Sequence, residues 1–397
     1  MEGRPAGHAG DARQRRLAVR VLAAERRLME LELTAEQEAL LGASRRLIGD
    51  HIPLSRVREL AEGAAADPKL IVRCAELGWL APFVPEELGG GSVSGDAMGD
   101  AALVAEVRGT GLLPEPFIGA NAASVLLTSA PEELAADVLP EHAAGEAIVV
   151  VPVDARAGVA GLAVEARPDG TDLVVGGTVL IAGREQVASV LVLVAGPEHR
   201  AVLVPLDAAG VTTDEAGVLD VTQPLTRVSL DEVRIPRERT FVVPAETVQR
   251  ASAVAATLSA CESAGAMQAL FGLTRDYAMD RVAFGRPIGS FQAIKHLLAD
   301  LSLTVESSVA VAGAAARAAR GDGRHHDEAA HLAKIYIGER VAGFVQGCQQ
   351  VFGGIGFAWE HDLHLFMRRL VANAALFGTV EAHRSQVLAV HAAELKE

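Results

Sequence analysis

The period of the hydrophobic pattern changes twice along this chain, and that order limits what the chain can fold into. Apolar residues recur at helical intervals from Thr34 to Leu127, with loops between the helical segments. Between about Ala147 and Phe241 the pattern becomes short β-branched runs separated by glycine, proline and aspartate, which is typical of strands. Helical period returns from Val248 to the end. The sequence therefore predicts a helical domain, a β domain and a second helical domain.

Length and composition fit this division. A chain of 397 residues holds two or three packed units. We expect a helical domain over 29–145, a β domain over 146–245 and a helical bundle over 246–397, with residues 1–28 as an extension. Thr34 and Gln37 have the spacing of a capping box, which predicts a helix start. Only 4% of residues are aromatic, so the core must consist of alanine, valine and leucine, which suits closely packed helices.

The net charge argues against several classes of binding partner, and the cysteine pattern indicates the redox compartment. The formal net charge of -15 opposes binding to nucleic acid or an anionic membrane, so local arginines must meet any phosphate-bearing ligand. No secretory signal and no bilayer-length apolar run is evident, which predicts a cytoplasmic protein. The cysteines lack a C-x-x-C pair and are expected to be small buried hydrophobes in a reducing compartment: Cys74, Cys261 and Cys348.

A short basic segment, RVAFGRPIGSFQ at 281–292, joins two of the C-terminal helices. Arg281 and Arg286 offer guanidinium forks for a phosphate group, and Phe284 offers an aromatic face. Gly285 and Gly289 let backbone approach a ligand closely. The alternative is an ordinary helix–loop–helix with two solvated arginines. We call this segment the elbow.

A second segment, QQVFGGIGF at 349–357, places two adjacent glycines and a third after a helix. Gly353 and Gly354 allow close approach of a planar or anionic ligand, and Gln350 can satisfy an amide or a ring edge. The alternative is a helix C-cap followed by a turn. We call this segment the glycine turn.

Together these motifs resemble the acyl-CoA dehydrogenase family. The elbow, followed by Lys295-His296, resembles the C-terminal signature of that family, and the glycine turn resembles its Q-x-x-G-G-x-G-F segment. G-W-L at 78–80, V-P-E-E-L-G-G at 84–90 and L-P-E-P at 113–116 follow the family's N-terminal order. The resemblance extends from about Thr34 to His391. It implies an N-terminal α-helical domain, a middle β-barrel or sandwich domain and a C-terminal four-helix bundle.

The resemblance also implies a cofactor and an oligomer. In that family the two C-terminal signatures hold the ADP half of an FAD that sits in a neighbouring subunit. The chain is therefore expected to act as a homo-oligomer or with a second acyl-CoA dehydrogenase-like chain. The expected FAD-binding residues are Arg281, Phe284, Gln292, Gln350, Gly353, Gly354 and Thr379.

The reaction implied by the family removes a proton alpha to an acyl thioester while hydride leaves the beta carbon for the flavin. It needs a carboxylate in a dry pocket. Many members supply it from a Y-E-G-T motif, but the matching residues here are L-F-G-T at 376–379, so Phe377 stands at the position of the usual glutamate. Other members place the base thirteen residues before a glutamine that matches Gln268. That position is Ala255 here.

A different acid lies on the same predicted helix. Glu262 follows Ala255 by seven residues, about two turns, and so lies on nearly the same face. An acid among apolar neighbours has a raised pKa and suits a base near neutral pH. Glu262 is thus the candidate catalytic base. The alternative is a buried ion pair with an arginine such as Arg368.

Other polar groups are assigned structural roles. Glu360 and Asp362 flank the glycine turn, and Glu381 is expected to complement a helix dipole, which ranks it below Glu262 as a base. His361 and His364 lack the convergent spacing of a metal site, so no metal is expected.

The middle domain departs most from the family pattern. Family members show a T-E-P-x-x-G-S-D loop and a W-I-T-N-like strand at the flavin, whereas this chain has V-P-V-D-A-R-A-G at 151–158 and L-I-A-G at 180–183. These departures favour a chain that binds FAD through its C-terminal half and contributes to a partner's site.

The resulting functional hypothesis is an FAD-dependent dehydrogenase. It would oxidise an acyl-CoA or acyl-carrier thioester and pass electrons to an acceptor such as an electron-transfer flavoprotein. One alternative is a non-catalytic partner subunit, and another is a flavin oxidase or monooxygenase of the same fold. The segment GFAWEHDLH at 356–364, with Arg368 and Arg369, resembles an actinobacterial branch of the family. That branch includes enzymes for steroid side-chain thioesters, several built from two unlike subunits.

Overall fold

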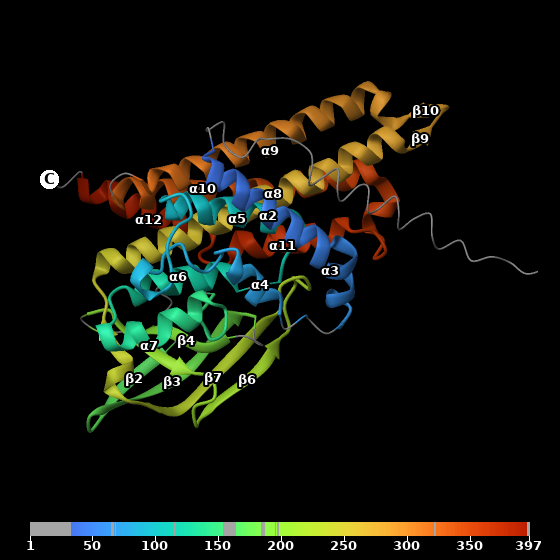
Figure 1. The fold of residues 1–397 in the computed structure, drawn as a ribbon. Coiled ribbons are helices and arrows are strands. Elements are labelled where there is room, and N and C mark those ends of the chain that lie inside the picture. The colour runs from blue at the N-terminus through green and yellow to red at the C-terminus, as the bar shows by residue number, and fades with distance from the viewer. Residues whose placement is uncertain are drawn as a thin grey trace, which may run out of the picture.

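Helices and strands segregate along the chain into the three parts that the hydrophobic pattern predicts (Figure 1). The computed structural model describes residues 33–64, 67, 69–114, 116–153, 164–183, 187–194, 196, 198–320 and 323–394. The expected extension over 1–28 and the 154–158 part of the departing loop lie outside these residues. Within them, the predicted order of helical, β and helical parts is confirmed.

The N-terminal part consists of helices around an apolar core. The first helix, α2, begins where the sequence predicts, because Thr34 and Gln37 form both hydrogen bonds of a capping box: the Gln37 N–H donates to Thr34 Oγ1 (3.2 Å) and the Thr34 N–H to Gln37 Oε1 (3.3 Å). The helices are α2 (Ala35–His51), α3 (Leu54–Ala61), α4 (Leu70–Glu76), α5 (Ala97–Gly111), α6 (Phe117–Leu127) and α7 (Glu132–Ala143), with a short 3-10 turn η1 (Glu86–Leu88).

The middle part contains two four-stranded sheets. One has the order β1-β4-β5-β8, in which β1 runs parallel to β4, and the other has the order β2-β3-β7-β6 with antiparallel pairs. Its elements are β1 (Ile148–Val150), β2 (Val164–Asp169), β3 (Asp172–Ala182), β4 (Val187–Val194), β5 (Arg200–Pro205), β6 (Val211–Ala216), β7 (Leu225–Ile235), the turn η3 (Arg237–Arg239) and β8 (Thr240–Val242).

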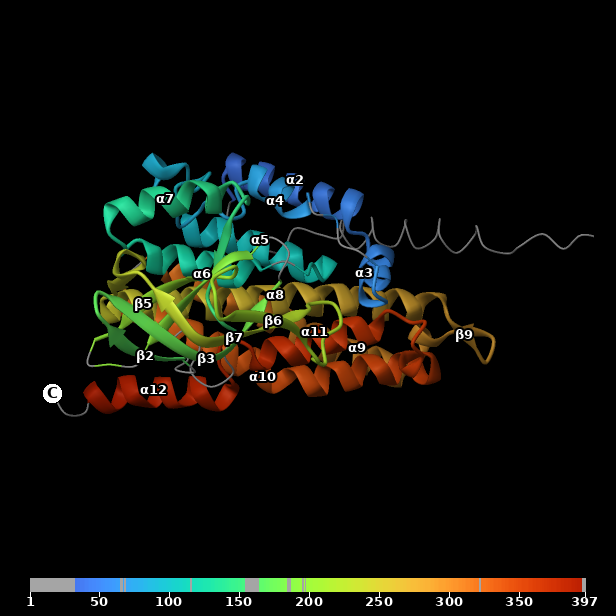
Figure 2. The same ribbon diagram turned by 90° about the horizontal axis from the view of Figure 1, so that it is seen from below.

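The C-terminal part is built on a 36-residue helix, α8, that runs through the molecule. Figure 2 shows α8 between the N-terminal helices on one side and the later helices on the other. At the end of α8 the elbow projects beyond the body (Figure 1). The elements are α8 (Ala245–Asp280), β9 (Val282–Ala283), β10 (Arg286–Pro287), η4 (Ile288–Ser290), α9 (Gln292–Ala318), α10 (Gly323–Phe352), η5 (Gly353–Phe357), α11 (Leu363–Ala375) and α12 (Val380–Glu394).

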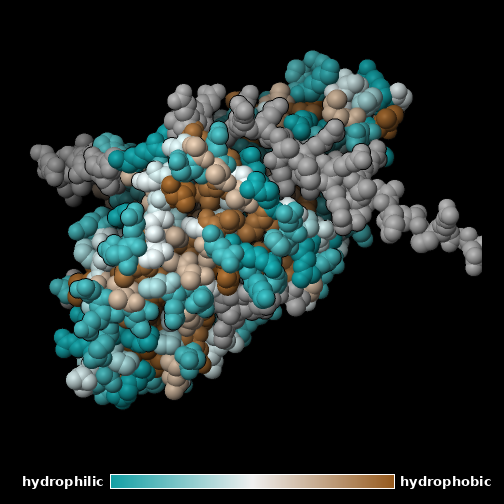
Figure 3. Space-filling view, in the orientation of Figure 1, coloured by the Kyte–Doolittle hydropathy of each residue, from teal (hydrophilic) through white to brown (hydrophobic). Residues whose placement is uncertain are grey.

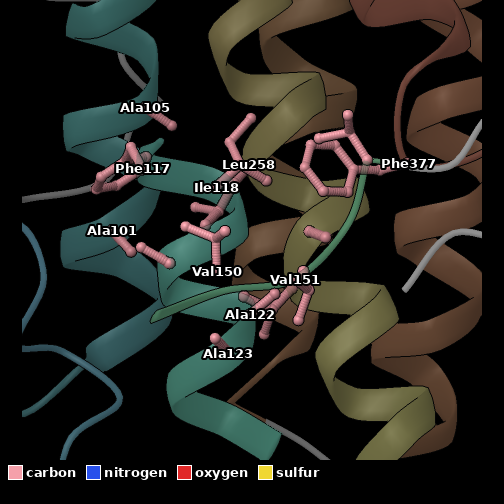
Figure 4. Packing of buried hydrophobic residues seen from close by; sticks show 14 of the residues in the cluster. Ala101, Ala105, Phe117, Ile118, Ala122, Ala123, Val150, Val151, Leu258 and Phe377 are labelled. Carbon is pink, nitrogen blue, oxygen red and sulfur yellow. The ribbon is translucent and has the colours of Figure 1, made fainter. Parts of the chain in front are cut away.

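Small residues let α5 and α8 pack backbone to backbone. A Cβ on Gly109 would overlap the carbonyl oxygen of Glu262, and a Cβ on Gly265 would overlap that of Glu106. Figure 4 shows the adjoining core, in which alanines of α5 and α6 meet Leu258 of α8, Val150 of β1 and Val151 just after that strand. The expected alanine-, valine- and leucine-rich core is thus confirmed, and all three cysteines are buried.

The sequence predicts no apolar run long enough to cross a bilayer, and helix α9 departs from this prediction. Among the described residues, α9 has the length and apolar composition of a membrane-crossing helix. Of its most apolar 18-residue segment, 33% is buried. Length and composition alone do not separate such a span from a packed helix, and α9 lies against α8 and α10. Leu303 on α9 is exposed.

Candidate functional site

The elbow is a tight hairpin, not an irregular loop. Strands β9 and β10 pair antiparallel, and the two residues between them, Phe284 and Gly285, both have left-handed backbone (φ 52° and 80°). That is the geometry of a two-residue hairpin turn. The turn holds the Phe284 ring 96% exposed. An aromatic ring this exposed on a projecting hairpin is available to a ligand or another chain.

Two arginines accompany that ring on the elbow. Arg281 follows the last residue of α8 and Arg286 begins β10, and both are exposed. The Arg286 guanidinium lies 4.1 Å from the centre of the Phe291 ring, which orients it. Gln292, the first residue of α9, is also exposed. The expected group of elbow residues is therefore together on one accessible surface.

The glycine turn lies at the same end of the molecule. The rings of Tyr277, on the last turn of α8, and Phe352, the last residue of α10, have centroids 4.7 Å apart. Directly after Phe352, Gly353 has left-handed backbone (φ 63°), and a Cβ on it or on Gly354 would meet no described atom within 4 Å. The ring contact between Tyr277 and Phe352 thus places the glycine turn, whose backbone is open to a ligand, near the base of the elbow.

These two surfaces fit one side of a phosphate-bearing ligand such as FAD. Among the described residues, neither Arg281 nor Arg286 forms an ion pair, and the backbone at Gly353 faces open space. All of these groups are exposed, so they cannot enclose a flavin ring by themselves. They suit the outer half of a dinucleotide that another subunit holds.

Both positions at which the family places its base carry buried apolar side chains. Phe377 is 4% exposed and shares an apolar cluster with Leu258 of α8 (Figure 4). Ala255 is fully buried on α8. Thr379, two residues after Phe377, accepts a hydrogen bond from the Ala382 N–H (3.2 Å) and so caps α12. Thr379 therefore has a structural role, and its expected contact with the cofactor stays a prediction.

Glu262 lies inside a buried network of charges. Its Oε1 accepts hydrogen bonds from Arg369 Nη1 and Asn373 Nδ2, both at 3.1 Å. Its Oε2 lies 3.8 Å from Arg108 Nε. The Glu262 carboxylate is thus paired with two guanidinium groups and hydrogen-bonded by an amide. These contacts correspond to the ion-pair alternative, but the partner is Arg369 and not Arg368, which donates to the Leu219 carbonyl (2.8 Å).

Arg369 joins all three parts of the chain. Its Nε donates to Asp220 Oδ2 (2.7 Å), and its Nη2 donates to the carbonyl oxygens of Leu112, Leu113 and Thr222. Burial alone would lower the pKa of Arg369, but the charges of Asp220 and Glu262 outweigh it and raise the pKa. The guanidinium is therefore permanently charged. Glu262 and Asp220 offset the charges of Arg108 and Arg369.

Sequence reasoning missed most of this network. Arg108 is the one cation on α5, and Lys334 follows the buried Ala333 on α10, so a cation among mostly apolar residues was the available signal in the sequence. Nothing in the sequence pairs either of them with Glu262. Of the other acids, Asp362 pairs with Arg58, and Glu381 lies exposed in the first turn of α12.

Comparison with known proteins assigns the family. The family model described as Acyl-CoA dehydrogenase, N-terminal domain, matches residues 34–146, and the one described as Acyl-CoA dehydrogenase, C-terminal domain, matches residues 246–391. The chain belongs to the acyl-CoA dehydrogenase family. It is accordingly an FAD-dependent oxidoreductase of the type that dehydrogenates acyl-CoA thioesters.

Individual relatives of this acyl-CoA dehydrogenase family member come from mycobacteria. The acyl-CoA dehydrogenase IpdE2 of Mycobacterium tuberculosis is 32% identical over 305 residues, which cover 76% of this chain and 80% of that protein. FadE34 of the same organism is 32% identical over 348 residues, covering 85% of this chain but 45% of FadE34. The ChsE4-ChsE5 complex from Mycobacterium tuberculosis has the same fold, with a TM-score of 0.81 and 20% identity, covering 92% of this chain and 99% of that one.

Proposed function

We propose that this chain is one of two unlike subunits of an acyl-CoA dehydrogenase, and that its elbow and glycine turn complete the flavin site of its partner. The observation that carries the proposal is a contrast within one chain. Groups suited to a dinucleotide, such as Arg281 of the elbow and Gly353 of the glycine turn, are exposed. The two base positions hold buried Phe377 and Ala255, and the candidate acid Glu262 is already ion-paired.

In such an enzyme the two chains contribute different groups to the active site. FAD, when bound, accepts the hydride that leaves the beta carbon of the thioester. Arg281 and Arg286 would neutralise phosphate charge, and the open backbone at Gly353 would let the dinucleotide approach closely. The partner chain would supply the carboxylate that takes the alpha proton, because neither Phe377 nor Ala255 can accept one.

The relatives support a two-chain enzyme. FadE34, at 32% identity, is about twice as long as the region that aligns with this chain, since 348 aligned residues are only 45% of it. The ChsE4-ChsE5 structure is by its title a complex of two named chains. On this basis we infer a cytoplasmic hetero-oligomer that passes electrons to an electron-transfer flavoprotein. Steroid side-chain thioesters are the first substrates to test.

The exposed apolar surface agrees with a partner chain. Phe284, Phe357 and Leu303 are 96%, 76% and 67% exposed. Figure 3 shows apolar residues over the middle of one face and at the projecting elbow, with hydrophilic residues around them. Exposed aromatic and aliphatic side chains of this size favour burial in an assembly.

The test is flavin uptake by the chain alone and together with a second acyl-CoA dehydrogenase-like chain. We expect a colourless chain alone and about one FAD per pair of chains in the assembly. Replacing both Arg281 and Arg286 by alanine should weaken FAD binding by the assembly at least tenfold, because each loses a charge-assisted contact. Arg167→Ala, which changes an exposed arginine on β2, is the matched control and should leave FAD binding unchanged.

Other results would favour the remaining hypotheses. One FAD per chain in a homo-oligomer, together with bleaching of that flavin by an acyl-CoA thioester, would identify a stand-alone dehydrogenase. Oxygen consumption without an added electron acceptor would identify an oxidase or monooxygenase. Either result would overturn the two-chain proposal.

A further inference from the structure

Lys334 is a buried cation with three acceptors around it. It lies on α10 and is 4% exposed, and its Nζ donates to Ser259 Oγ (3.2 Å), to the Leu376 carbonyl (2.8 Å) and to the Asn373 carbonyl. Burial lowers the pKa of Lys334 to about 7, while the charge of Glu262 acts in the opposite direction. Each of the three N–H directions of an ammonium group therefore has a partner.

These contacts fix the place where α11 ends. Asn373 is in the last turn of α11, and Leu376 is the first residue after it, so Lys334 holds carbonyl groups that no helical N–H can reach. A cation at a helix C-terminus is also favoured by the helix dipole. Ser259 connects the same ammonium group to α8. Residue 376 is thus held by the Lys334 side chain of α10 and not by its own helix alone.

A second contact from α10 acts on the start of α12. His331 lies one turn before Lys334, and its Nδ1 is 2.8 Å from Nδ1 of His383 on α12. His383 in turn packs beneath Gly378, because a Cβ on Gly378 would lie 2.7 Å from His383 Nε2. Two imidazole nitrogens at this distance share one proton in a hydrogen bond. His331 therefore reaches the second end of the segment 376–379 through His383.

Between these two contacts the backbone is strained. Phe377 has left-handed backbone (φ 57°), which is unusual for a bulky side chain, and Gly378 follows with φ 108°. Such a conformation persists only where the surroundings hold it. The burial of the Phe377 ring and the hydrogen bond that Thr379 accepts from the Ala382 N–H both help to hold this conformation.

We propose that Lys334 and His331 form a two-point clamp on residues 376–379, and that both are positioning residues for this segment. The clamp sets the backbone at residue 377, where the family places its base, and at Thr379, which is expected to contact FAD. Its functional part rests on the proposed flavin-binding assembly. Its structural part is a property of this chain alone.

The structural part is tested by amide hydrogen exchange on the isolated chain. Three N–H groups at the segment's ends are hydrogen-bonded, those of Leu376, Ala382 and His383. In Lys334→Met they should exchange at least tenfold faster. In Ser44→Ala, which removes the buried Trp79–Ser44 hydrogen bond of the N-terminal part, they should be unchanged. If Lys334→Met does not fold, Lys334→Gln retains two donors and should give a smaller increase at the same amides.

The functional part is tested in the assembly with the second chain. Lys334→Met should weaken FAD binding at least fivefold and shift the flavin absorbance band, with the mass of the assembly unchanged. Unaltered exchange at the three amides overturns the clamp. Faster exchange with unaltered FAD binding and spectrum overturns the positioning role. An unmutated assembly that takes up no FAD overturns the proposed function, whereas the exchange result would still decide whether the clamp exists.

Discussion

At the scale of single residues, a substitution of Glu262 tests whether this acid has a catalytic or a structural role. Glu262→Gln should lower the free energy of unfolding by about 1–3 kcal/mol, because it leaves the guanidinium groups of Arg108 and Arg369 with one buried acid fewer. Urea unfolding measures this change. Thioester-dependent bleaching of the flavin in the assembly should stay within about twofold of the unmutated value, since the partner chain supplies the base.

The control for this change is Glu381→Gln, which alters an exposed acid and should leave stability within about 0.5 kcal/mol. Loss of bleaching with unchanged stability in Glu262→Gln would restore Glu262 as the base. The sequence identified this acid as unusual because its neighbours are small and apolar. It could not identify Arg369 as the partner, because the two residues lie on different helices and meet only when α8 and α11 pack together.

At the scale of elements, the α5–α8 contact depends on two glycines. Gly265→Ala should lower the free energy of unfolding by about 3 kcal/mol, because the added methyl group would overlap the Glu106 carbonyl and push the helices apart. Gly343→Ala on α10 is the matched control. A Cβ there meets nothing within 4 Å, so this change should stabilise the chain by about 0.5–1 kcal/mol. Equal effects of the two changes would contradict the close contact.

Most elements were predictable because they depend on local pattern. The capping box at Thr34 and the β-branched runs of the middle part are read from neighbouring residues, and the structure confirms both. The elbow was predicted as a loop, but it is a hairpin with two left-handed residues. Phe284 is the reason for this difference, since a bulky residue at positive φ gives no turn signal in the sequence.

At the scale of the whole molecule, buried histidines predict sensitivity to acid. Burial lowers the pKa of His142 and His326 to about 4 and that of His383 to about 3. Each unfolded histidine takes up a proton near pH 6.5. Their contribution to stability is therefore complete above pH 6.5 and is lost as pH falls toward 4.

Two acids, the buried Glu106 and the half-buried Asp327, act in the opposite direction over part of this range. Burial raises the pKa of Glu106 to about 8 and that of Asp327 to about 6, so both favour the folded state as pH falls. Because the three histidines outnumber the two acids, the free energy of unfolding should fall as the pH is lowered from 6 to 5. Urea unfolding at these pH values should show the loss. A free energy of unfolding that stays constant or rises toward pH 5 would contradict it.

Arg369 has a consequence for the unity of the fold. One guanidinium group touches carbonyl oxygens of the N-terminal part, Asp220 of the middle part and Glu262 of the C-terminal bundle. Cutting the chain between these parts would leave a buried charge without its counter-charge in at least two of the fragments. The middle part and the C-terminal bundle therefore cannot be exchanged singly with those of a relative that lacks this arginine and its two acids, and a chimaera would have to inherit all three residues together.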